Sequence, residues 1–147
     1  MTDNAAEELN QSGRCDCGAI VLTATGRPLS MFHCACENCQ RASGSGHSSV
    51  VLFHANAIRV VGATKTYARP AASGATFLRH FCPECGCTLL AQSSRAPSLR
   101  IVPIGVFSGQ NDWFEPGQLI FAGTLPDWDR IDEHLPRHAA YKAGSAP

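Results

Sequence analysis

The sequence has no excess of charge of either sign. In 147 residues, twelve Lys and Arg balance twelve Asp and Glu, so the formal net charge is zero and the pI is near 7.0. A neutral chain lacks the broad basic field that attracts nucleic acid or anionic lipid. We therefore expect neither nucleic acid nor a membrane surface as a partner, and a zinc-ribbon nucleic-acid binder is disfavoured for the same reason.

Long hydrophobic runs are also missing. The longest, residues 50–53 and residues 99–107 with Arg100 and Pro103 inside, are far shorter than the roughly 20 residues that span a bilayer. The acidic, polar N-terminus lacks the basic start and apolar core of a signal peptide. We expect a cytoplasmic protein without a transmembrane helix. Its cysteines would then be reduced and free to bind metal.

Helix-forming segments are few, and short strand-like segments dominate. Only residues 37–42 and 129–135 leave room for a helix, and both are short. Gly- and Pro-containing turns separate runs rich in β-branched and aromatic residues, which predicts a mainly β protein. The predicted strands are residues 19–24, 49–53, 58–61, 75–81, 88–91, 99–104 and 118–122.

The chain length suits one domain. We expect a flexible N-terminal arm over residues 1–13, a single zinc-binding β domain over residues 14–138 and a C-terminal tail over residues 139–147. The sequence indicates no particular oligomeric state.

Eight cysteines form three groups, and the first and third resemble zinc knuckles. Two thiolates on a glycine-containing turn can reach one ion, and two such turns supply the four ligands of a closed structural site. Cys15 and Cys17 can therefore share a zinc ion with Cys82 and Cys85. Buried metal-free thiols and a thioredoxin-like redox pair are alternatives, and the redox pair expects a βαβ context that this sequence lacks.

The middle group, Cys34, Cys36 and Cys39, supplies three thiolates within six residues. A zinc ion held by them keeps one position unfilled, as catalytic zinc sites do, and thiolate ligands favour a soft incoming ligand such as a substrate thiol. Alternatively Cys87, His33 or His47 fills the fourth position and closes a second structural site. The sequence alone leaves both possibilities open.

Taken together, the spacings Cys-x-Cys-Gly, Cys-x-Cys-x-x-Cys with Ser43-Gly44, and Phe81-Cys-x-x-Cys-Gly resemble the glutathione-dependent formaldehyde-activating enzyme family. The similarity runs from about residue 14 to residue 137 and includes the closing segments Gln118-Leu-Ile-Phe and Leu135-Pro-Arg. It implies a β-tent fold of stacked antiparallel sheets. It also implies a structural zinc on Cys15, Cys17, Cys82 and Cys85 and a catalytic zinc on Cys34, Cys36 and Cys39.

The activity implied by this resemblance is that of a zinc-dependent carbon-sulfur lyase. Such an enzyme adds a thiol, glutathione or a similar one, to formaldehyde or another small aldehyde and gives an S-hydroxymethyl adduct. Its partners would be a small-molecule thiol and an aldehyde, and its cofactor would be Zn²⁺, two per chain. The alternative is a non-enzymatic zinc-binding module of the same fold that contacts other proteins, because fold alone does not set function.

The sequence departs from the family pattern near the middle cysteines, where Gln40 follows Cys39 and Arg41 comes next. Three arginines beside cysteine groups, Arg14, Arg41 and Arg79, could offset thiolate charge or receive a substrate carboxylate. His33 and His47 could relay protons or contact substrate. Trp113, Phe114 and Trp128 could line a pocket but more often belong to a core.

Overall fold

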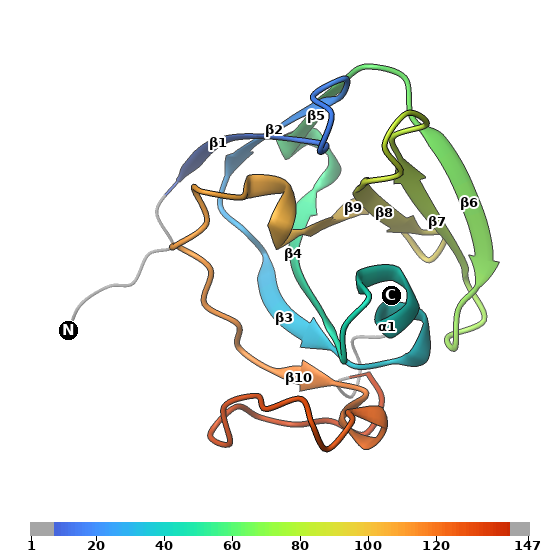
Figure 1. Ribbon diagram of the computed structural model, residues 1–147, viewed down its shortest axis with the longest axis vertical. Coiled ribbons are helices and arrows are strands. Elements are labelled where there is room, and N and C mark those ends of the chain that lie inside the picture. Colours follow the sequence, from blue (N-terminus) through green and yellow to red (C-terminus); the bar gives the residue numbers. More distant parts are fainter. Residues whose placement is uncertain (1–7, 142–147) are drawn as a thin grey trace.

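The computed structural model describes residues 8–141, which form two β-sheets and one short α-helix (Figure 1). The first sheet has three strands in the order β1-β2-β5, and the second has seven in the order β10-β3-β4-β9-β8-β7-β6. The strands are β1 Leu9–Arg14, β2 Val21–Gly26, β3 Ser30–Cys34, β4 Ser48–His54, β5 Ile58–Val61, β6 Lys65–Pro70, β7 Thr76–Phe81, β8 Thr88–Ser93, β9 Ala96–Pro103 and β10 Leu119–Ile120. The helix is α1 Glu37–Ser43, and three 3-10 helices are η1 Ala55–Ala57, η2 Ile104–Phe107 and η3 Ala122–Thr124.

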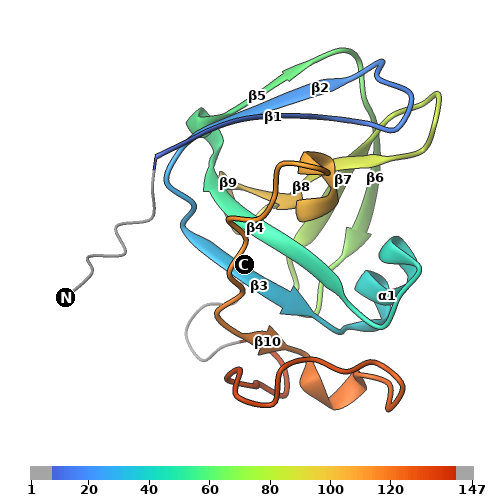
Figure 2. The same cartoon turned by 60° about the vertical axis from the view of Figure 1, so that its left-hand side comes forward.

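The main core lies between the two sheets. Leu22 and Ala24 of β2 are fully buried, and they belong to the same apolar cluster as Phe53 of β4 and Val102 of β9. These residues alternate with more exposed neighbours along their strands, so each strand turns one face inward. Burying one such Phe or Leu side chain contributes about 2 kcal/mol. Figure 2 shows the three-stranded sheet across one end of the seven-stranded sheet.

The C-terminal part of the chain covers the opposite end of the larger sheet (Figure 2). β10 pairs with β3 in parallel, whereas the other strand pairs are antiparallel. A second apolar cluster holds this segment in place, with Ala35, Leu119 and Ile131 buried together. The loop that carries the middle cysteines therefore packs against the C-terminal segment.

The prediction of a mainly β protein with little helix is confirmed, and each of the seven predicted strands overlaps an observed one. The structure adds β1, β3 and β6, which the sequence analysis did not assign. The arm expected over residues 1–13 is corrected from residue 9 onward, because β1 pairs with β2 along its whole length. Residues 1–7 and 142–147 lie outside the described residues.

Two further expectations concern the helices and the C-terminal tail. The short helix expected over residues 37–42 is present as α1, but the one considered for residues 129–135 is wrong, because these residues are irregular chain with a turn at residues 133–134. Residues 139–141 of the expected tail pack against the domain, where the Phe121 amide donates to the Ala140 carbonyl oxygen at 3.1 Å. No helix among residues 8–141 is long and apolar enough to cross a membrane.

Candidate metal centres

The first cysteine cluster joins the turn between β1 and β2 to the turn between β7 and β8. In both turns the first cysteine, Cys15 or Cys82, donates its amide to the carbonyl oxygen five residues later, at 3.0 and 2.9 Å. A glycine then donates back to that cysteine's carbonyl oxygen. Gly18 and Gly86 do so with φ near +80°, a conformation that glycine adopts without strain. Each turn thus curls around its first cysteine.

The four sulfurs of these turns converge. The Sγ atoms of Cys15, Cys17, Cys82 and Cys85 all lie within 4.8 Å of one another. Cys17 Sγ is 3.7 Å from both Cys15 Sγ and Cys82 Sγ. A tetrahedral zinc ion with bonds of about 2.3 Å separates its sulfurs by about 3.8 Å. The four-cysteine cluster therefore has the donor set and the spacing that suit a closed metal site.

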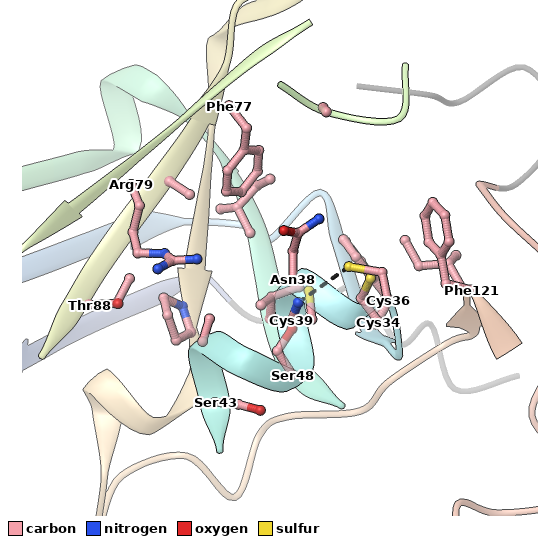
Figure 3. A pocket seen from close by; sticks show the side chains of 18 of the residues that line it. Cys34, Cys36, Asn38, Cys39, Ser43, Ser48, Phe77, Arg79, Thr88 and Phe121 are labelled. Carbon is pink, nitrogen blue, oxygen red and sulfur yellow. Dashed lines mark hydrogen bonds between the residues drawn. The ribbon is translucent and has the colours of Figure 1, made fainter. Parts of the chain in front are cut away.

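The second cluster lies where β3 ends and α1 begins. Cys34 is the last residue of β3, and Cys36 caps the N-terminus of α1, where its Sγ accepts the Cys39 amide at 3.3 Å (Figure 3). The three Sγ atoms lie within 4.8 Å of one another. In residues 8–141 no further Cys, His, Asp or Glu belongs to this three-cysteine cluster, so the structure does not bring Cys87, His33 or His47 into it.

The three thiols share negative charge unequally. Cys36 accepts hydrogen bonds from the thiols of Cys34 and Cys39, and these contacts lower the pKa of Cys36 well below its ordinary value. Cys34 donates to its neighbours and is buried, which raises the pKa of its thiol. The nearby Arg69 cation further lowers the pKa of Cys36. The cluster is thus suited to carry a thiolate charge, the state in which cysteine binds metal.

A cavity of about 540 Å³ opens beside the second cluster. Cys34, Cys36 and Cys39 line it, and so does Cys87, whose pKa is raised by burial. Its walls are mainly apolar, and its cationic side chains are Arg69 and Arg79. Figure 3 shows the cysteines on one side of the pocket and Arg79 on the other. The apolar wall includes Phe32, Val50, Phe77, Ala91, Ile101, Val106, Ile120 and Phe121.

Residues 10–124 match the family model of GFA, the glutathione-dependent formaldehyde-activating enzyme. The chain belongs to the GFA family. The crystal structure of a Rhodobacter sphaeroides protein, a structural genomics target, is similar to this chain with a TM-score of 0.55 and 23% sequence identity, and the match covers 69% of this chain and 92% of that one. At this identity the similarity concerns the fold alone. No curated protein matches the chain significantly.

Of the three arginines singled out in the sequence of this GFA-family chain, only Arg79 lines the cavity. Arg14 instead donates to the carbonyl oxygens of Cys15 and Asp16 at 3.0 and 2.7 Å and braces the first turn. Arg41 lies on the exposed face of α1, 3.8 Å from Glu37. An exposed pair of this kind contributes little to stability.

The two histidines near the middle cysteines form a separate group in the GFA-family chain. His33 Nδ1 lies 2.8 Å from Ser49 Oγ, and its ring packs edge-on against that of His47 at 4.7 Å. Burial and the neighbouring His47 together lower the pKa of His33 to about 4, against the opposing effect of the Asp129 carboxylate. His47 Nδ1 in turn contacts the Asp129 carboxylate. This group ties β4 to the C-terminal segment and does not line the cavity.

The aromatic candidates lie mostly in the core. Trp113 and Phe114 pack against the main apolar cluster, and Trp128 is 69% exposed. None of the three lines the cavity.

Sequence reasoning missed Arg69, Asn38, Phe121 and Tyr141 as cavity residues. Asn38 lies inside the motif of the middle cysteines, and Phe121 ends the closing segment Gln118-Leu-Ile-Phe. Both motifs were recognised in the sequence, so they could have indicated these two residues. Arg69 and Tyr141 lie on β6 and in the expected tail, and no motif marks either position.

Proposed function

We propose that the chain is a zinc-dependent carbon-sulfur lyase that adds a thiol, such as glutathione, to formaldehyde or another small aldehyde. The observation that carries this proposal is the convergence of three thiols on the wall of a cavity large enough for a thiol compound. Membership of a family named for an enzyme supports it.

In this proposal each cysteine cluster holds one zinc ion. Cys15, Cys17, Cys82 and Cys85 form the closed structural site, and Cys34, Cys36 and Cys39 hold a second ion that faces the cavity. A bound zinc ion keeps an incoming thiol ionised and nucleophilic at neutral pH.

The cavity residues of the chain would hold and orient the reactants. The apolar walls exclude water, and Arg69 and Arg79 balance the negative charge of thiolates. A carbon-sulfur bond forms as the carbonyl double bond of the aldehyde gives its electron pair to oxygen, which takes up the proton that the thiol lost. The Ser48 hydroxyl and the Asn38 amide lie beside Cys39 on the cavity wall and can donate to that oxygen (Figure 3).

The test is a calorimetric titration of reduced glutathione into zinc-loaded protein, with metal counted on the same sample. We expect saturable binding and about two zinc ions per chain. Cys36→Ser should lose one zinc and the thiol binding while the fold persists. Adduct formation is then followed by NMR with isotopically labelled formaldehyde, at a rate above that of the uncatalysed addition.

A non-enzymatic, protein-contacting module is the rival. Global unfolding of Cys36→Ser, or two bound zinc ions without binding of glutathione or of simpler thiols, would favour a closed structural second site and overturn the proposed activity.

A further inference from the structure

The cavity carries positive charge without a balancing carboxylate. Among the residues that line it in the described part of the chain, Arg69 and Arg79 are cationic and none is Asp or Glu. Arg69 Nε is buried and has no hydrogen-bond partner among residues 8–141. The ion pairs in the same residues join Arg41 to Glu37 and His47 to Asp129, so neither cavity arginine is neutralised. An anion entering the cavity meets no competing protein carboxylate.

The two arginines act at different places. Arg69 lies close enough to the second cluster for its charge to lower the pKa of Cys36, and its guanidinium stacks on Phe77 at 4.3 Å. Arg79 lies 5.8 Å from the Tyr67 ring. Figure 3 shows its guanidinium directed into the pocket on the side away from Cys34 and Cys36. A thiol held at the cysteines would therefore extend its far end toward Arg79.

We propose, building on the proposed thiol addition, that Arg79 binds a carboxylate at the far end of the thiol substrate and that the preferred substrate is a mercaptocarboxylate without an ammonium group. A guanidinium donates two parallel hydrogen bonds to a carboxylate, which fixes its position. An ammonium group, such as the one in glutathione, would face two guanidinium groups and no carboxylate. Its burial there costs free energy, so glutathione should still bind but less tightly than a mercaptocarboxylate.

The apolar walls agree with this assignment. Phe32, Val50 and Ile101 line the cavity together with Phe77 and Phe121, so the space that a substrate skeleton would fill is surrounded by hydrocarbon. A substrate with one thiol, one carboxylate and an apolar skeleton between them matches the distribution of groups around the cavity.

The test compares three thiols of the same carbon skeleton in titrations of zinc-loaded protein. These are 3-mercaptopropionate, 3-mercaptopropan-1-ol, which lacks the carboxylate, and cysteine, which adds an ammonium group to 3-mercaptopropionate. We expect 3-mercaptopropionate to bind at least about tenfold more tightly than either of the others.

Variants separate recognition of the carboxylate from general charge balance. Because the three thiols differ in acidity, each is compared between the native chain and the variant. Arg79→Gln should reduce the preference for 3-mercaptopropionate to within about twofold, and Arg79→Lys should keep part of it. Arg41→Gln removes the same charge from the exposed face of α1 and should leave all three affinities unchanged. Zinc content and melting temperature show whether each variant is folded.

Three outcomes would overturn this inference. Equal affinity for the acid and the alcohol, or cysteine binding as tightly as 3-mercaptopropionate, would remove the carboxylate selection. If Arg79→Gln weakened the binding of all three thiols by the same factor, Arg79 would only offset thiolate charge. If no thiol bound the native zinc-loaded protein, the proposed thiol addition would itself fail and this inference with it.

Discussion

Phe121 is the one residue other than glycine with a positive φ in the described part of the chain, at φ 53°. Its ring lines the cavity and packs against Tyr141 at 4.9 Å. A side chain in this left-handed conformation costs about 1–2 kcal/mol, which glycine does not incur. Phe121→Gly and Phe121→Ala both remove the ring, but we expect the glycine variant to be more stable by about 1 kcal/mol in urea unfolding.

The matched control for this comparison of glycine and alanine variants is Phe114, whose φ is not positive. There the usual order should hold, and Phe114→Ala should be more stable than Phe114→Gly because glycine loses more backbone entropy on folding. The same order at both positions would show that the Phe121 backbone carries no strain.

At the scale of elements, η3 is clasped to the loop that carries the middle cysteines. Gln40 Nε2 donates to the carbonyl oxygens of Ala35 and Thr124 at 3.1 and 2.9 Å, and Thr124 Oγ1 donates to Ala35 at 2.7 Å. Gln40→Ala should destabilise the protein by about 1 kcal/mol. It should also speed hydrogen exchange at the η3 amides, because the clasp loses one of its two side chains.

Arg41→Ala is the control for the clasp, since Arg41 is the neighbour of Gln40 on α1 and points into solvent. Its unfolding free energy and η3 exchange should match those of the native chain. An unchanged exchange rate in Gln40→Ala would show that Thr124 and the apolar cluster hold η3 without Gln40.

Two of the three strands that the sequence analysis missed, β1 and β6, lack a hydrophobic signal. β1 and β6 are the edges of their sheets, and five of the six residues of β6 are exposed, so tertiary pairing rather than composition defines them. The helix considered for residues 129–135 fails because its acids have other partners. Asp129 contacts His47, and Asp132 Oδ1 accepts the His134 amide at 2.9 Å, a turn-forming bond that competes with helix.

The cysteine clusters were predictable because thiolate ligands must be close in sequence or on paired turns, and their spacing records this. The cavity beside the three-cysteine cluster could not be predicted from the sequence. Arg69 comes from an unpredicted edge strand and Tyr141 from the expected tail, and nothing in the sequence shows that these segments meet Cys36. Arg79 was one of three candidate arginines, and only the register of β7 between β6 and β8 places it at the cavity.

Across the whole molecule the two clusters that could hold metal draw their cysteines from very different sequence separations. Cys17 and Cys82 are 65 residues apart and join turns of different sheets, whereas Cys34, Cys36 and Cys39 lie within one loop and one helical turn. A metal ion in the four-cysteine cluster would therefore close a long loop and stabilise the packing of the sheets. Cys82→Ser should lower the melting temperature by more than Cys36→Ser does, and chelators should unfold the protein when the four-cysteine cluster loses its ion.

Calorimetric melting of the two serine variants, each with its zinc counted, checks this difference. An equal decrease in melting temperature, or a larger one for Cys36→Ser, would show that the three-cysteine cluster stabilises the fold more than its short sequence span indicates.

The long separation between the two cysteine turns also has a consequence during protein synthesis. A ribosome adds roughly 5–20 residues per second, so the 65 residues between Cys17 and Cys82 take about 3–13 s to make. For that interval the nascent chain holds half of its four-cysteine cluster, with the later pair still to be translated. The early thiols then depend on the reducing power of their surroundings, so a brief oxidative stress would harm newly made chains more than finished ones.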